Sequence, residues 1–353
     1  MKFSDLAAYL PALERTIDRS YRASRRAAAP VFRPYLDGLS EFTLRGGKRF
    51  RALLVLGGYR IASRGPMAAA LPAAAALEHF QSWMLVHDDI IDHSEERRGG
   101  PTLHRVIEQR HLAQKMIGRS DEYGVGIGIT LGDLQEPFTV EGILASPVAE
   151  RRRLAALTEY VRMTRETAYG QLLDIQNGAT PVDQVREADV LLVHRLKSAI
   201  YTVASPLRIG AVIGGGRGAL LEELEAFGVD VGVAFQLRDD ILGTGFDASS
   251  AGKSANDLVE GKRTLLVVRA WAEADAAGRA CLSAVLGHPE ASDAEVEEAR
   301  AVIRSTGSLA YSERRIEELS ERALRRVDRS PRLRAGDREL LHDVAGRLIR
   351  RSR

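Results

Sequence analysis

The chain has 353 residues, of which 45% are hydrophobic and 28% charged, values that are ordinary for a globular protein and exclude collagen-like and disordered classes. Its 50 Lys and Arg residues against 48 Asp and Glu leave a net charge of +2, which argues against nucleic-acid binding through a strong positive field. The single cysteine, Cys281, excludes an internal disulfide framework and a cysteine-based zinc site.

The longest apolar run covers residues 67–77, which is too short to cross a bilayer, and it contains Pro72. The first residues, Met1-Lys2-Phe3-Ser4-Asp5, carry no signal-peptide core. We therefore expect a cytoplasmic protein with no stable membrane insertion and no nucleic-acid partner.

Helical periodicity extends along almost the whole chain. Apolar residues recur every three or four positions, as at Leu220, Leu224, Phe227 and Val231, whereas β-branched alternation is scarce. These patterns predict an all-α protein of about ten or more helices. Loops are expected near residues 62–66, 97–101, 119–124, 177–183, 214–218 and 243–257. Because no linker rich in Pro, Ser or Gly splits the chain, we expect a single domain over residues 1–353.

The first motif in chain order is basic and rich in glycine. Residues 45–51 read Arg-Gly-Gly-Lys-Arg-Phe-Arg and precede a leucine-rich helix. Glycines let the backbone approach a ligand closely, and a helix start that carries Lys48 and Arg51 suits a phosphate. Taken alone, such a cluster is more often a solvated surface.

The second motif is acidic and reads Asp-Asp-Ile-Ile-Asp at residues 88–92, at the end of an apolar helix expected to begin near Leu71. Asp88 and Asp92 lie four residues apart and share one helix face. Their repulsion calls for a counterion, and carboxylate ligands favour Mg²⁺ bound together with substrate phosphates. Taken alone, the motif is equally compatible with a solvated acidic helix end.

A second acidic motif, Phe-Gln-Leu-Arg-Asp-Asp at residues 235–240, ends the helix that runs from Leu220. Further cations lie in or beside expected loops and helix starts, namely Arg97, Arg98, Lys197, Lys253 and Lys262. Two carboxylate groups and several scattered cations in a nearly neutral helical chain fit one kind of ligand. That ligand is a diphosphate held through metal ions on the carboxylates, with Arg and Lys around its outer oxygens.

These motifs and their order resemble those of the polyprenyl synthetase family, the trans-isoprenyl diphosphate synthases. The resemblance covers residues 44–266. It rests on Gly-Gly-Lys-Arg-x-Arg at 46–51, Asp-Asp-x-x-Asp at 88–92, Arg-Arg-Gly-x-Pro-Thr-x-His at 97–104, Gly-Gln-x-x-Asp at 170–174, Lys-Ser-Ala at 197–199, Phe-Gln-x-x-Asp-Asp at 235–240 and Gly-Lys-Arg-Thr at 261–264. The resemblance implies an isoprenoid-synthase fold, in which helices surround a deep central cavity, and a homodimer.

The resemblance also implies a prenyltransferase that condenses an allylic diphosphate head to tail with isopentenyl diphosphate. Asp88, Asp92 and Asp239 would hold Mg²⁺, or Mn²⁺, on the allylic diphosphate. The other contacts to that diphosphate would be Arg97, Lys197, Ser198, Gln236, Lys253 and Lys262. The isopentenyl diphosphate site would comprise Lys48, Arg51, Gln81 and Arg98. We expect the three aspartates, Lys197 and Arg97 to be the catalytic residues.

Two segments depart from the family pattern. Gly243 stands where the family usually has the third aspartate of the second acidic motif. Residues 132–137, Gly-Asp-Leu-Gln-Glu-Pro, are more polar than the family pattern, and Pro137 should disturb the helix there.

The residues before the first acidic motif bear on product length. Trp83 and Met84 lie five and four residues before Asp88. A single aromatic residue at the fifth place resembles geranylgeranyl-forming members, so we expect geranylgeranyl diphosphate as the main product. A farnesyl or a longer product, and a non-catalytic subunit of a heteromeric synthase, stay open as alternatives. A terpene cyclase is disfavoured, because it would not need the two basic motifs.

Overall fold

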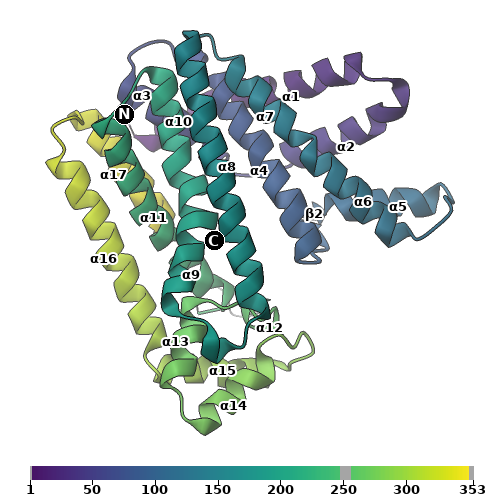
Figure 1. Ribbon diagram of the computed structural model, residues 1–353, viewed down its shortest axis with the longest axis vertical. Helices are drawn as coiled ribbons and strands as arrows, with labels where there is room; N and C mark the ends of the chain where they lie inside the picture. The colour runs from purple at the N-terminus through teal and green to yellow at the C-terminus, as the bar shows by residue number, and fades with distance from the viewer. Residues whose placement is uncertain (1, 247–255, 350–353) are drawn as a thin grey trace. The chain divides into compact units, whose positions relative to one another are not determined.

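The computed structural model describes residues 2–246 and 256–349 and consists almost entirely of helices (Figure 1). It divides into two compact units. The first unit comprises Phe3–Glu159 and Pro206–Arg217, and the second comprises Met1–Lys2, Tyr160–Ser205 and Gly218–Arg353. Two of the boundaries between them fall within helices α8 (Glu150–Ala179) and α10 (Ser205–Gly214), and the other two lie after Lys2 and after Arg217. The predicted all-α class is confirmed, whereas the single domain over residues 1–353 stays a prediction.

The remaining elements of the first unit are helices, three of them short 3₁₀ helices, and one two-stranded ribbon. They are η1 (Phe3–Tyr9), α1 (Leu10–Ala27), η2 (Pro30–Phe32), α2 (Arg33–Leu44), α3 (Phe50–Ala62), η3 (Met67–Ala69), α4 (Leu71–Ile91), β1 (Glu96–Arg97), β2 (Gly100–Pro101), α5 (Leu103–Ala113), α6 (Ser120–Asp133) and α7 (Gln135–Leu144).

Helix α4 forms the centre of the first unit, and α1, α3, α6 and α7 pack against it. It begins at Leu71, as predicted, with Pro72 in its first turn, where the missing N–H costs no hydrogen bond. The small side chains of residues 73–76, all alanine, are buried, so neighbouring helices can approach closely. The first half of α4 is therefore buried within the unit, and the acidic motif lies at the opposite, carboxyl end of the helix.

The second unit contains the remaining helices, of which η5 is a π-helix. They are η4 (Val182–Gln184), α9 (Glu187–Val193), η5 (His194–Ala204), α11 (Ala219–Gly243), α12 (Asn256–Val259), α13 (Leu265–Glu273), α14 (Ala276–Val285), α15 (Asp293–Ser305), α16 (Ser308–Arg329) and α17 (Ala335–Ile349).

Helix α11 forms the centre of the second unit, with α16 packed along it (Figure 1) and η5 packed against it. Gly228 and Gly232 of α11 face the backbone of η5. A Cβ atom added to either glycine would lie about 2.5 Å from the Cα of Ala204 or Ala199, which is too close for any side chain. These two glycines therefore allow the wide π-helix to lie directly on α11.

One sequence prediction of local structure is wrong, and one element was not predicted. The loop expected near residues 119–124 lies earlier, because Gly118 with φ +91° ends the turn and α6 begins at Ser120 with two acids in its first turn. The short ribbon of β1 and β2 was not foreseen. By contrast, the helix is interrupted at Leu134, as Pro137 led us to expect. Within the described parts of the chain, no helix combines the length and apolarity that crossing a bilayer requires.

Candidate active site

The first acidic motif lies at the carboxyl end of α4. Asp88 is half-buried, and Asp92 is exposed and follows the last helical residue, Ile91. The amide of Asp92 still donates to the carbonyl of Asp88 at 2.8 Å, so the two carboxylates remain on one face, as predicted. Because the helix dipole is negative at this end, the two carboxylates favour a bound cation.

The middle residue of the motif, Asp89, is fully buried and pairs with Arg97 on the ribbon. Its Oδ1 atom lies 2.7 Å from Nε and 2.5 Å from Nη2 of Arg97. Burial raises the pKa of the Asp89 carboxyl, and the Arg97 guanidinium offsets part of this rise. The pair fixes one predicted diphosphate contact beside the motif. Asp89 is not among the residues for which the sequence predicted a role.

The glycine-rich basic loop is held by Arg49, which has φ +49° and a buried side chain. Its guanidinium donates to the carbonyls of Thr43 and Leu44 and to Glu78 of α4. Lys48, the residue before it, is exposed. Arg49 therefore anchors the loop so that Lys48 points to solvent.

Two further residues of the predicted isopentenyl diphosphate site lie near this loop. The Arg98 guanidinium lies against Gly47, because a Cβ added there would be 3.2 Å from its Cζ. Its Nη1 atom donates to the carbonyl of Arg45 at 3.4 Å. The structure thus brings Arg98 and the loop that carries Lys48 together. Arg51 follows in the first turn of α3, and Gln81 is buried on α4.

The second acidic motif lies at the carboxyl end of α11. Asp239 is exposed, whereas Asp240 is buried. Ser198 of η5 donates to Gln236 at 2.7 Å, and Gln236 donates to Asp240 at 2.9 Å. His194 Nε2 lies 3.1 Å from the other oxygen of Asp240. This chain of contacts fixes Ser198 and Gln236, two predicted diphosphate contacts. It does so through Asp240, which lies in the quoted motif but had no predicted role, and through His194, which lies in no quoted motif.

Lys197 lies on the same π-helix and pairs with Asp174 of α8, with 2.7 Å between Nζ and Oδ2. Wide π-helical turns are frequent at functional sites. Asp174 belongs to the Gly-Gln-x-x-Asp motif quoted above, so the sequence contained the signal for this partner.

Lys262 follows α12 and pairs with two acids. Its Nζ atom lies 2.9 Å from Asp257 and 2.8 Å from Glu260. Burial raises the pKa of the Asp257 carboxyl to about 6, although Lys262 acts in the opposite direction. Lys253, the other lysine predicted to contact the diphosphate here, lies outside the described residues.

The two predicted chain-length residues are half-buried on α4. Trp83 packs edge-on against Phe80 and His87 of its own helix, with ring centroids 5.8 and 6.2 Å apart. One turn before Trp83 on the same helix, His79 contacts the side chain of Gln135. Gln135 is fully buried and accepts a hydrogen bond from the Tyr21 hydroxyl. The polar residues at 132–137 that depart from the family pattern therefore include a core hydrogen-bonding group.

The carboxylates fit a magnesium site completed by substrate. Within the described residues, no group of three or more His, Cys, Asp or Glu side chains could hold a metal ion alone. Mg²⁺ commonly takes only one or two carboxylates and completes its shell with water and substrate phosphates. Asp88 with Asp92, and Asp239, offer oxygen donors of this kind.

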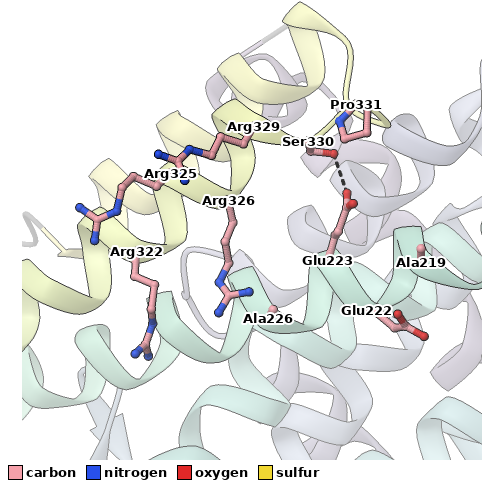
Figure 2. A pocket seen from close by; sticks show the side chains of 10 residues that line it. All are labelled: Ala219, Glu222, Glu223, Ala226, Arg322, Arg325, Arg326, Arg329, Ser330 and Pro331. Carbon is pink, nitrogen blue, oxygen red and sulfur yellow. Dashed lines mark hydrogen bonds between the residues drawn. The ribbon is translucent and has the colours of Figure 1, made fainter.

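A separate groove of about 640 Å³ lies between α11 and α16 in the second unit. Figure 2 shows that four arginines of α16 line one side of it, Arg322, Arg325, Arg326 and Arg329. Asp230 Oδ1 lies 2.6 Å from Nη2 of Arg322, and Glu223 accepts a hydrogen bond from the Ser330 hydroxyl. No predicted site residue lines this groove.

The chain is similar in sequence to proteins of one family. The family model described as polyprenyl synthetase matches residues 33–303. A geranylfarnesyl diphosphate synthase of Aeropyrum pernix is 33% identical over 90% of this chain and 94% of its own length. A geranylgeranyl diphosphate synthase of Methanosarcina mazei is 31% identical over 80% of both chains.

Among solved structures, a geranylgeranyl pyrophosphate synthase of Corynebacterium glutamicum is similar over 97% of this chain and 98% of its own. The TM-score is 0.87 and the sequences are 32% identical. That protein was crystallised with isoprenyl diphosphate and magnesium.

Proposed function

We propose a specific reaction for this chain, which belongs to the polyprenyl synthetase family and is a trans-prenyltransferase. The reaction is the head-to-tail condensation of an allylic diphosphate with isopentenyl diphosphate. The observation that carries the proposal lies in the first unit. There the end of α4 carries two carboxylates, Arg97 pairs with Asp89, and Arg98 lies against the basic loop. This arrangement supports the assignment of metal ligands and diphosphate contacts to these residues.

In this proposal the allylic diphosphate is held by Asp88, Asp92 and Asp239 through Mg²⁺, with Mn²⁺ as a possible substitute. When bound, the metal supplies positive charge that stabilises the departing diphosphate. Arg97, Lys197, Ser198, Gln236, Lys253 and Lys262 contact its remaining oxygens. Asp174 and Asp89 orient two of these cations before the substrate arrives, which lowers the reorganisation needed in the transition state.

Lys48, Arg51, Gln81 and Arg98 hold isopentenyl diphosphate in the proposed mechanism. The allylic carbon–oxygen bond breaks, the isopentenyl double bond attacks the allylic carbon, and a carbon–carbon bond forms. The proton lost from the new product passes to the departing diphosphate. Holding both substrates in one geometry makes the step effectively unimolecular.

We propose geranylgeranyl diphosphate as the main product, because an aromatic residue, Trp83, stands at the fifth place before Asp88 and the non-aromatic Met84 stands at the fourth. The solved Corynebacterium structure of a protein named for that product supports this choice. A longer geranylfarnesyl product is the second candidate, since two relatives, 33% and 30% identical, carry that name.

A homodimer is proposed from the surface of α8. Within the second unit, Val161, Tyr169, Leu172 and Ile175 are 49–64% exposed and fall on one helix face. Such an exposed apolar stripe is typical of a subunit interface. Light scattering of the purified chain should therefore give twice the monomer mass, and a monomer would contradict this proposal.

The purified chain tests the proposed function directly. Incubation with Mg²⁺, labelled isopentenyl diphosphate and an allylic diphosphate should transfer label into a longer, extractable diphosphate. If label is transferred only after a second, different subunit is added, the chain is the non-catalytic partner and the proposal is wrong.

A further inference from the structure

The second acidic motif lacks its usual third carboxylate, because position 243 is glycine. Gly243 is the last residue of α11 and lies four residues after Asp239, so it falls one turn further along the same face. The space beside it is not open. A Cβ added at 243 would lie 1.9 Å from Oδ2 and 2.6 Å from Cγ of Asp257. The carboxylate of Asp257 therefore occupies the position into which a side chain at 243 would project.

Lys262 holds Asp257 in this position through two hydrogen bonds. Its Oδ1 atom accepts a bond from Lys262 Nζ at 2.9 Å, and its carbonyl accepts a bond from the Lys262 amide at 3.0 Å. Its side chain is only 16% exposed. Lys262 engages Oδ1, whereas Oδ2 is the oxygen that faces Gly243.

The charge at this end of α11 favours a bound cation. Asp239, Asp240 and Asp257 bring three carboxyl groups to the carboxyl end of a helix, where the helix dipole is already negative. The Arg300 side chain donates to the carbonyl of Thr244 just past the helix. Lys262 offsets part of the charge of Asp257, and His194 lies 3.1 Å from Asp240; a cation bound beside the three carboxyl groups would offset the rest.

We propose that Asp257 takes the place of the missing third acid of the second motif, as a positioning residue that supplies negative charge to the metal–diphosphate complex beside Asp239. The inference rests on the proposed function. It explains why glycine stands at 243, since any larger residue there would displace the Asp257 carboxylate.

The test is the affinity for Mn²⁺ in the presence of inorganic diphosphate, measured on the full chain by electron paramagnetic resonance of free Mn²⁺. Asp257→Asn preserves shape and removes the charge, so it should weaken Mn²⁺ binding about tenfold, as loss of an outer-shell carboxylate commonly does. Gly243→Asp should weaken it at least as much, because the new side chain meets Asp257.

The double variant Gly243→Asp/Asp257→Gly returns the carboxylate to the usual position and removes the clash. Its Mn²⁺ affinity should lie within about threefold of that of the parent. If positions 243 and 257 acted independently, the losses from the two substitutions would add and the affinity would not recover. Glu260→Gln is the matched control, because it also removes an acid that pairs with Lys262 but leaves Asp257 in place, and it should match the parent.

An Asp257→Asn variant that binds Mn²⁺ as tightly as the parent would overturn the inference. A double variant that binds Mn²⁺ no more tightly than Gly243→Asp would also overturn it. If Gly243→Asp does not fold, Asp257→Asn compared with Glu260→Gln decides alone. If the parent chain itself fails to bind Mn²⁺ with diphosphate, the proposed function is wrong, which is a different outcome from failure of Asp257.

Discussion

Arg49 and Glu78 form a buried ion pair in the first unit, with 3.1 Å between Nη1 and Oε2 and side chains that are 2% and 4% exposed. The pair joins the start of α3 to the middle of α4. It therefore connects the loop that carries Lys48 to the helix that carries Asp88. In the Gly-Gly-Lys-Arg motif, the arginine stabilises the loop while the exposed lysine remains available for ligand.

Breaking this pair should be strongly destabilising. Arg49→Met leaves Glu78 buried without its partner, and we expect the free energy of unfolding to fall by about 3–5 kcal/mol. The double variant Arg49→Met/Glu78→Leu removes both charges and should regain most of that loss. Urea denaturation of the full chain measures both values. A single variant as stable as the parent would show that the pair does not hold the loop.

The predicted isopentenyl diphosphate site is tested by measuring the KM of each substrate separately. Lys48→Ala and Arg51→Ala each remove one cation assigned to isopentenyl diphosphate. Each should raise the KM for isopentenyl diphosphate about 10- to 100-fold, the usual cost of a charge-assisted hydrogen bond, and change the allylic KM much less. Arg60→Ala, at the far end of α3, is the control. Equal effects on both substrates would mean that the two diphosphate sites are assigned wrongly.

His79 should make the fold sensitive to acid. Burial lowers the pKa of its imidazole to about 4, and the ring contacts Ser20, Tyr21 and Gln135. The unfolded chain binds this proton near pH 6.5. The contribution of neutral His79 to the free energy of unfolding is therefore complete above pH 6.5. It is lost as the pH falls towards 4, and the free energy of unfolding then decreases by about 3 kcal/mol.

The measurement is the free energy of unfolding at several pH values between 4 and 7.5. His79→Gln should flatten the profile in this range, because the side chain no longer titrates. The exposed His288 gives the control, His288→Gln, which should keep the parent profile. A parent-like slope in His79→Gln would assign the acid sensitivity to other groups.

Product length depends on the residues before the first acidic motif. Trp83→Ala removes a half-buried ring one turn and a fraction before Asp88, and longer products should follow because the growing chain meets less bulk. Chromatography of the products from each allylic starter measures the shift. Unchanged products would mean that another element sets the length, and the buried Gln135 segment near Glu136 and Pro137 is then the first place to look.

The sequence predicted the all-α class, the start of α4 and the positions of both acidic motifs, because helical periodicity and motif spacing are local properties. It did not predict the partners Asp89, Asp174 and His194. Those contacts depend on how helices pack, and packing joins residues that lie far apart in the chain. The close contact of Gly243 with Asp257 is of the same kind, since the sequence shows only that an aspartate is missing.

Some assignments depend on the family resemblance rather than on residue patterns. A lysine or serine in a helix has no pattern that marks it as a diphosphate contact. Lys197 and Ser198 gain physical support from their fixed partners, Asp174 and Gln236. Their roles toward substrate stay predictions.

The metal dependence of product formation tests the central proposal most directly. The purified chain should convert an allylic diphosphate and isopentenyl diphosphate to a longer product with Mg²⁺ and form none with a chelator. Asp88→Ala should lower turnover on the order of a thousandfold while retaining its helical circular dichroism. Asp121→Ala, which removes an exposed carboxylate of α6, should match the parent. Near-normal turnover in Asp88→Ala, or without any divalent metal, would contradict the account.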